Sequence, residues 1–171
     1  MTEGNAPARA WRADVIQDFA RSELFDRTFQ EGMDLVEETA AYLDGAGRQE
    51  SKLLSRNAAL AYAGESMRLT TRLMQVASWL LVQRAVREGD MAPEGACDDR
   101  YRLGAGDVCR NGAETAQDLP AGLLLLLDRS ERLYERVRHL DRRMYVEQDA
   151  AAEAPNPVQN QMGLLQAAFG R

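Results

Sequence analysis

The longest periodic stretch of the sequence runs from Gln49 to Glu88, which contains no Pro and a single Gly, Gly64. Apolar and small residues recur at steps of three and four, as on one face of an α-helix: Leu60, Ala63, Met67, Thr70, Met74, Ala77 and Leu81. A second set lies nearly opposite: Tyr62, Ser66, Leu69, Leu73, Val76 and Leu80. A surface helix needs only one apolar stripe. The pattern therefore predicts a continuous helix of roughly 40 residues, about 60 Å long, sandwiched between two partner helices.

A first helix is predicted before this stretch, firm from about Ser22, with residues 14–19 either extending it or forming a short preceding turn. Its apolar stripe is Phe25, Phe29, Gly32 or Met33, Val36, Ala40 and Leu43. The helix is expected to end at Asp44, with Gly45 as a left-handed cap. Because the connection to the next helix is short, the two should form an antiparallel pair. Residues 1–10 are small and polar, and we expect them to be unpacked.

After Glu88 the periodicity disappears, and residues 89–118 are rich in Gly, Asp and Asn, which predicts a long mobile loop. A third helix is expected from Asp118 or Leu119, with Pro120 in its first turn. It has the most regular stripe of the chain: Leu119, Leu123, Leu126, Ser130, Leu133, Val137, Leu140 and Met144. The prediction is an all-α, antiparallel three-helix bundle over residues 1–147, with a long second helix and a flexible C-terminal tail, 148–171.

The composition narrows the possible functions. The net charge is −6 and the isoelectric point is near 4.9, which argues against general affinity for nucleic acid or anionic membranes. No apolar run approaches the ~20 residues of a membrane span, and the polar N-terminus lacks a hydrophobic signal segment, so we expect a cytoplasmic protein. Cys97 and Cys109 should then be reduced, unpaired thiols.

Catalytic and metal chemistry find little support in the sequence. His139 is the single histidine, which rules out most metal and nucleophile sites that need paired histidines or a Cys–His arrangement. Glu135 stands four residues before it, not three as in the di-iron bundle motif. The sequence therefore predicts no enzyme activity, no metal and no cofactor.

Three features could carry function through binding. A basic stripe on the third helix, Arg129, Arg132, Arg136 and Arg143, either holds an acidic partner or is a solvated face partly paired with acidic residues of the first helix. Trp79 lies on the polar side of the middle helix in line with Arg72, Gln75 and Gln83, and either tucks under the loop or is buried by another subunit. The tail has a short apolar cluster that could dock into a partner's groove: Val158, Met162, Leu164, Leu165 and Phe169.

Two long segments, FDRTFQEGMDLVEETAAYLDG from Phe25 to Gly45 and YAGESMRLTTRLMQVASWLLVQRAV from Tyr62 to Val86, together with LLLLLDRSERLYERV in the third helix, resemble the alphaproteobacterial family of regulators of CtrA degradation. The resemblance implies a dimerising three-helix adaptor for the ClpXP protease, without an active site, whose C-terminal segment takes part in docking. It also implies partners: the ClpX unfoldase, a small response regulator that primes it, a cyclic-di-GMP-binding effector, and substrates such as CtrA.

Two alternatives remain open at this point: a helical scaffold for dimerisation or localisation without a protease role, and an acidic, DNA-associated regulator that uses the basic stripe. No helix-turn-helix pattern supports the second.

Overall fold

The computed structural model describes residues 6–104 and 118–145, and its regular structure is helical throughout these ranges. In chain order the helices are α1 (Ala6–Ala20), α2 (Glu23–Asp44), α3 (Ala46–Ser51), α4 (Arg56–Glu88), α5 (Pro93–Ala96), a 3-10 turn η1 (Asp99–Tyr101) and α6 (Ala121–Tyr145). The expected all-α bundle is confirmed.

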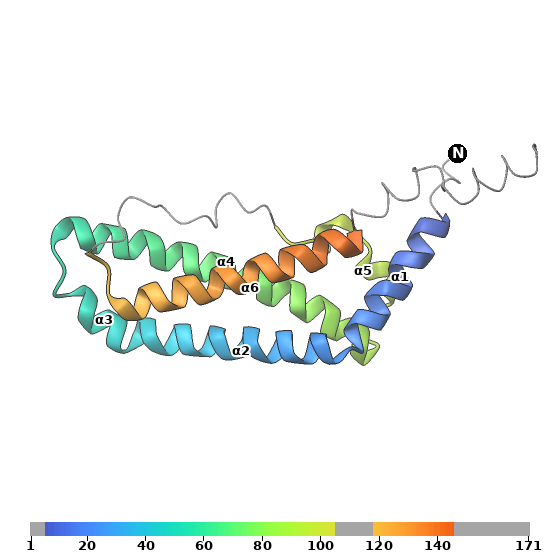
Figure 1. Ribbon diagram of the computed structural model, residues 1–171, viewed down its shortest axis with the longest axis horizontal. Helices are drawn as coiled ribbons and strands as arrows, with labels where there is room; N and C mark the ends of the chain where they lie inside the picture. Colours follow the sequence, from blue (N-terminus) through green and yellow to red (C-terminus); the bar gives the residue numbers. More distant parts are fainter. Residues whose placement is uncertain (1–5, 105–117, 146–171) are drawn as a thin grey trace, which may run out of the picture.

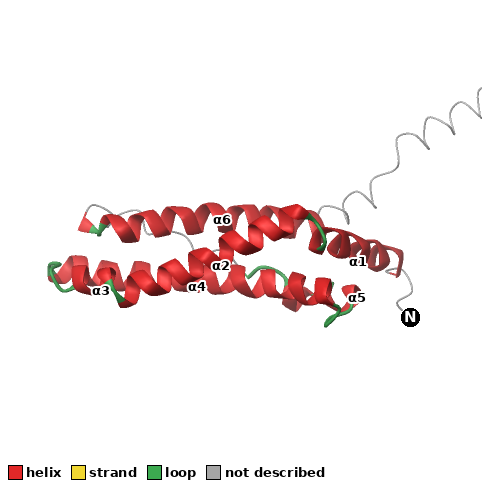
Figure 2. Ribbon diagram, turned by 90° about the horizontal axis from the view of Figure 1, so that it is seen from below, coloured by secondary structure: helices red, strands yellow, loops and turns green. Residues whose placement is uncertain are grey.

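Three long helices, α2, α4 and α6, lie side by side along the length of the molecule, and α1 crosses them at one end (Figure 1). In the view turned by 90°, α6 and α4 form two neighbouring rows (Figure 2). Asp26 and Gly32 of α2 lie next to Arg87 and Leu80 of α4, in reverse order along the chain, so these two helices are antiparallel, as predicted. One detail differs: Arg72 and Trp79 of α4 contact Ser130 and Asp141 of α6 in the same order, so α4 and α6 run in the same direction.

The parallel arrangement of α4 and α6 explains why the connection between them is long. The chain leaves α4 at Glu88 and must return along the bundle to begin α6 at Ala121. Sequence analysis expected this whole connection to lack structure, and that is wrong for residues 89–104. They contain α5 and η1, and Ala96 and Cys97 are buried against the core.

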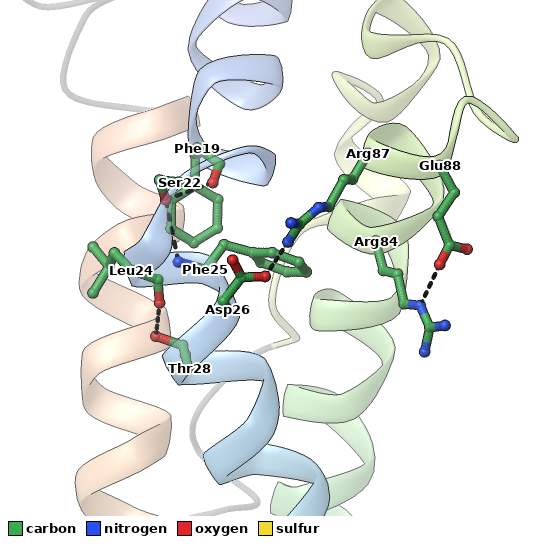
Figure 3. A network of polar contacts seen from close by, with 9 residues as sticks. All are labelled: Phe19, Ser22, Leu24, Phe25, Asp26, Thr28, Arg84, Arg87 and Glu88. Atoms are coloured by element: carbon green, nitrogen blue, oxygen red, sulfur yellow. Dashed lines mark hydrogen bonds and ion pairs between the residues drawn. The ribbon is translucent and has the colours of Figure 1, made fainter.

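The first predicted helix is in fact two helices, because the chain turns at Arg21 and Ser22 (Figure 3). Ser22 caps α2: its Oγ accepts from the Phe25 N–H at 3.1 Å and donates to the Phe19 carbonyl at 2.7 Å. The rings of Phe19 and Phe25 meet edge to face, with centroids 5.7 Å apart, so the corner has its own apolar contact. Residues 1–10 were expected to be unpacked, but α1 already begins at Ala6.

Two further boundaries differ from the prediction. The helix expected to run unbroken from Gln49 is interrupted between Ser51 and Arg56, where Ser55 caps α4 by accepting from the Ala58 N–H at 3.3 Å. Gly45 ends α2 as expected, but its φ of −105° is not left-handed, because α3 starts at the next residue. The left-handed glycine is Gly89, φ +82°, at the end of α4.

Candidate protein-binding surface

The outer side of α4 carries a row of exposed apolar side chains. Leu60, Met67, Met74 and Leu81 are 68, 71, 65 and 50% exposed. They are spaced seven residues apart, and the small residues Ala63, Thr70 and Ala77 alternate with them. We call these seven residues the α4 apolar face. It is about 32 Å long at the standard helical rise, and the described part of the chain leaves it uncovered.

This orientation corrects the prediction that α4 is sandwiched between partners on both apolar stripes. The second stripe is inside, with Leu69, Val76 and Leu80 each at most 1% exposed, but the first stripe faces solvent. The side of α4 that was predicted to be polar, which includes Arg72 and Trp79, faces the core instead of the first stripe.

Two residues on the polar side of α4, Arg72 and Trp79, are buried and donate hydrogen bonds to α6. Arg72 is 1% exposed, and its Nη1 donates to Ser130 Oγ at 2.7 Å and to the Leu127 carbonyl at 3.3 Å. Trp79 is 2% exposed, and its Nε1 donates to Asp141 Oδ1 at 3.0 Å. Burial of polar groups is tolerated where they are paired in this way. Arg72 therefore joins the core instead of reaching solvent.

These positions correct the expectation that Arg72, Gln75, Trp79 and Gln83 form a subunit interface. Arg72, Trp79 and Gln83 are buried inside their own chain, and Gln75 is half-buried. Trp79 was expected either to tuck under the loop or to be buried by another subunit, and the structure shows the first.

The segment that covers Trp79 consists of residues 98–104, which we call the strap. The Leu103 N–H donates to Asp141 Oδ1 at 3.1 Å, and Arg102 Nη2 lies 3.3 Å from Asp141 Oδ2. At its end, the Gly104 carbonyl accepts from Tyr134 Oη at 2.9 Å. Asp141 thus joins α4, α6 and the strap through one buried carboxylate. Nothing in the periodicity indicated this segment; the apolar Leu103 within a polar stretch was the available signal.

The basic stripe of α6 is largely paired within the chain. Arg129 lies 2.6 Å from Glu38 and Arg136 lies 2.5 Å from Glu31, both on α2, as the solvated-face alternative expected. Arg132 pairs with Asp128 of its own helix at 2.9 Å, while Arg143 is exposed. Exposed pairs of this kind contribute about 0–1 kcal/mol each, so they add little to the stability of the bundle.

The comparisons with known proteins fit this architecture. A family model described as "Protein of unknown function (DUF1465)" matches residues 16–169. The crystal structure of RcdA from Caulobacter crescentus CB15 is 74% identical in sequence, covering 77% of this chain and 98% of the RcdA chain, with a TM-score of 0.63. The chain belongs to the RcdA family. The resemblance seen in the sequence is thereby confirmed, and no curated protein matches the chain.

The match to the family model extends to residue 169 and so includes the tail. The predicted docking residues Val158, Met162, Leu164, Leu165 and Phe169 lie outside the described residues.

Cys97 and Tyr145 are both buried. Burial raises the pKa of the Cys97 thiol, which favours its neutral, unreactive form; Cys109 lies outside the described residues. Burial also raises the pKa of Tyr145, whose Oη donates to the Ala96 carbonyl at 2.8 Å. Within residues 6–104 and 118–145, no cluster of three or more His, Cys, Asp or Glu side chains could hold a metal ion. None of the helices in these ranges is long and apolar enough to span a bilayer.

Proposed function

We propose that this protein is a non-catalytic adaptor that helps to deliver cell-cycle substrates, such as CtrA, to the ClpXP protease. The observation that carries the proposal is the 74% identity to RcdA over 98% of its chain, since that family is understood as regulators of CtrA degradation. The exposed α4 apolar face supports the same proposal, because an adaptor requires binding surfaces and no reaction centre.

The α4 apolar face is the surface that we assign to protein binding, and a second copy of the chain is the partner it fits first. Large residues repeat every seven positions with small ones between them, which is the spacing of a helix–helix seam. Ala63, Thr70 and Ala77 would let a facing backbone approach closely. Exposed apolar patches of several hundred Å² are typical of interaction sites in otherwise soluble domains. The dimer seam is thus proposed on the side of α4 opposite to Arg72.

Delivery requires a second contact, which we assign to the tail with Leu165 and Phe169 as anchors. Tethering raises the local concentration of a substrate near the unfoldase to about mM for a short flexible linker, so modest affinities suffice at each contact. The partners proposed for these contacts are ClpX, its response-regulator priming factor and a cyclic-di-GMP-binding effector. The expected location is the cytoplasm, with recruitment to the cell pole.

Reconstituted ClpXP with its priming factor tests the delivery step. We expect the full chain to accelerate degradation of CtrA. The variant Leu165→Ala/Phe169→Ala should lose most of that acceleration, with helix content and dimerisation unchanged. If the full chain accelerates no substrate, the protein is a helical scaffold, and the proposed adaptor function is wrong.

The seam is tested by a matched pair of exposed leucines. Leu81 on α4 is 50% exposed and Leu24 on α2 is 53% exposed, so a Glu at either position costs little in the monomer. A charge in an apolar seam is strongly unfavourable, and Leu81→Glu should therefore raise the dimer dissociation constant by about tenfold or more, while Leu24→Glu should not. Sedimentation velocity across a concentration series measures both, and equal effects would refute the assignment.

A further inference from the structure

An open pocket of about 370 Å³ lies between α4 and the strap. Its volume falls within the range of small-ligand and peptide-anchor pockets, roughly 300–1,000 Å³. The floor and one wall come from α4, and the other wall is basic and aromatic: the main lining side chains are Met74, Trp79, Val82, Arg100, Tyr101 and Arg102. Met74 belongs to the α4 apolar face, so the pocket is a recess at the edge of that face.

The pocket is held in shape by contacts already described. Its floor residue Trp79 and the strap residues Arg102 and Leu103 all bond to Asp141. At the rim, the Arg100 guanidinium lies over the Tyr101 ring, 4.7 Å from the centroid, and is 3.5 Å from Asp98. The side chain of Arg100 remains 70% exposed. Arg100 is thus paired with Asp98, and Arg102 with Asp141, so the rim is polar and charge-balanced around the recess.

The chain leaves the described structure beside this pocket. Tyr145 is the last residue of α6, and the guanidinium carbon of Arg102, a pocket residue, lies 5.7 Å from the centre of its ring. Residues 146–171 follow. Every charged side chain in this segment before Arg171 is acidic: Glu147, Asp149 and Glu153. Residues 146–171 therefore follow directly on a residue, Tyr145, that contacts the strap.

The apolar part of the tail can reach the pocket easily. Met162 stands roughly 17 positions beyond Tyr145, and a flexible chain of that length has a root-mean-square span of about 23 Å. Met162, Leu165 and Phe169 are spaced three and four residues apart, which would place them on one side of a helix. A tether of this length gives a local concentration of about mM, so even docking with a dissociation constant of about 0.1 mM would be mostly occupied.

We propose that residues 158–171 of the tail dock intramolecularly on the recess between α4 and the strap. Phe169 or Leu165 fills the pocket. The tail would then lie at the edge of the α4 apolar face, which it shares with the pocket through Met74. This inference goes beyond the adaptor function and does not require it.

Photo-crosslinking in the full chain tests the proposal. The probe is Phe169→p-benzoylphenylalanine, and unlabelled and ¹⁵N-labelled copies are mixed so that links within and between chains differ in mass. We expect links within one copy to the peptides that contain Met74 or Tyr101. Met74→Glu should reduce their yield about fivefold or more, since it removes apolar contact and adds a charge that opposes the acidic tail.

Met67→Glu is the matched control, because Met67 is equally exposed on the same face but does not line the pocket. It should weaken the dimer seam without reducing the intrachain links. Links mainly between copies would overturn the proposal in favour of docking on a second subunit. The absence of links to the pocket, or equal yields in the Met74→Glu and unsubstituted chains, would overturn it as well. Because Leu81→Glu tests the seam separately, the two proposals fail independently.

Discussion

Replacement of Asp141 should destabilise the fold more than any surface charge on α6. This carboxylate is 3% exposed and receives hydrogen bonds from Trp79 Nε1, the Leu103 N–H and Arg102 Nη2. The first two bonds go to Oδ1 and the third to Oδ2. The two oxygens therefore have separable roles: Oδ1 accepts from one N–H of α4 and one of the strap, and Oδ2 pairs with the guanidinium of Arg102.

The loss in the free energy of unfolding can be worked out for each substitution of Asp141 from these contacts. Asp141→Ala leaves the N–H groups of Trp79 and Leu103 without their acceptor, at about 1–3 kcal/mol each. A total loss of about 3 kcal/mol in the free energy of unfolding is expected. Asp141→Asn can keep Oδ1 as the acceptor for both donors and loses only the pair with Arg102. Because Arg102 is one-third exposed, that loss should be about 1 kcal/mol or less.

Urea unfolding followed by far-UV circular dichroism measures these differences. The urea concentration at the midpoint reports stability, provided that the slope of the free energy of unfolding against urea concentration is unchanged. Asp128→Ala is the control: its pair with Arg132 is exposed and contributes about 0–1 kcal/mol. Amide exchange of Leu103 should accelerate in Asp141→Ala. If Asp141→Ala is no less stable than Asp128→Ala, the carboxylate does not hold the strap and the reasoning is wrong.

Two further predictions concern packing and pH. A Cβ on Gly122 would lie 2.6 Å from the Tyr42 ring, whereas one on Gly64 meets nothing within 4 Å. Thermal unfolding should therefore show Gly122→Ala destabilised by about 1–3 kcal/mol and Gly64→Ala stabilised by about 0.5–1 kcal/mol; the reverse order would contradict the model of the bundle. Burial raises the pKa of Tyr145 above its ordinary value of 10.0, so the folded state holds the phenol proton more tightly. The stability this provides is complete below pH 10.0 and is lost as the pH rises further; unfolding at pH 9 and 11 should show a smaller loss in Tyr145→Phe.

The sequence predicted α2 and α6 well because each has one apolar stripe and an opposite charged side. Leu123, Leu133 and Val137 of the predicted α6 stripe are fully buried, and the stripe ends at Met144, one residue before the end of the helix. Pro120 directly precedes the helix. For helices with a single apolar stripe, the periodicity predicts both that a helix forms and which of its faces is buried.

The strap and the corner at Ser22 could not be read from periodicity, since both depend on contacts between distant residues. Leu103 is fixed by a carboxylate 38 positions away. The segment is short and contains polar residues, so its local composition is that of a loop. Only the tertiary contact with Asp141 distinguishes it from a solvated segment.

The facing of α4 is the most informative difference, because it links the fold to the proposed function. The helix has two apolar stripes and one polar stripe, and a core can cover only part of its circumference. Arg72 and Trp79 find specific acceptors on α6, so the polar stripe enters the core together with Leu69 and Leu80. The remaining apolar stripe is then left outside. A buried polar stripe thus releases apolar surface for binding, and the residues that set the bundle alignment also determine which face of α4 is offered to partners.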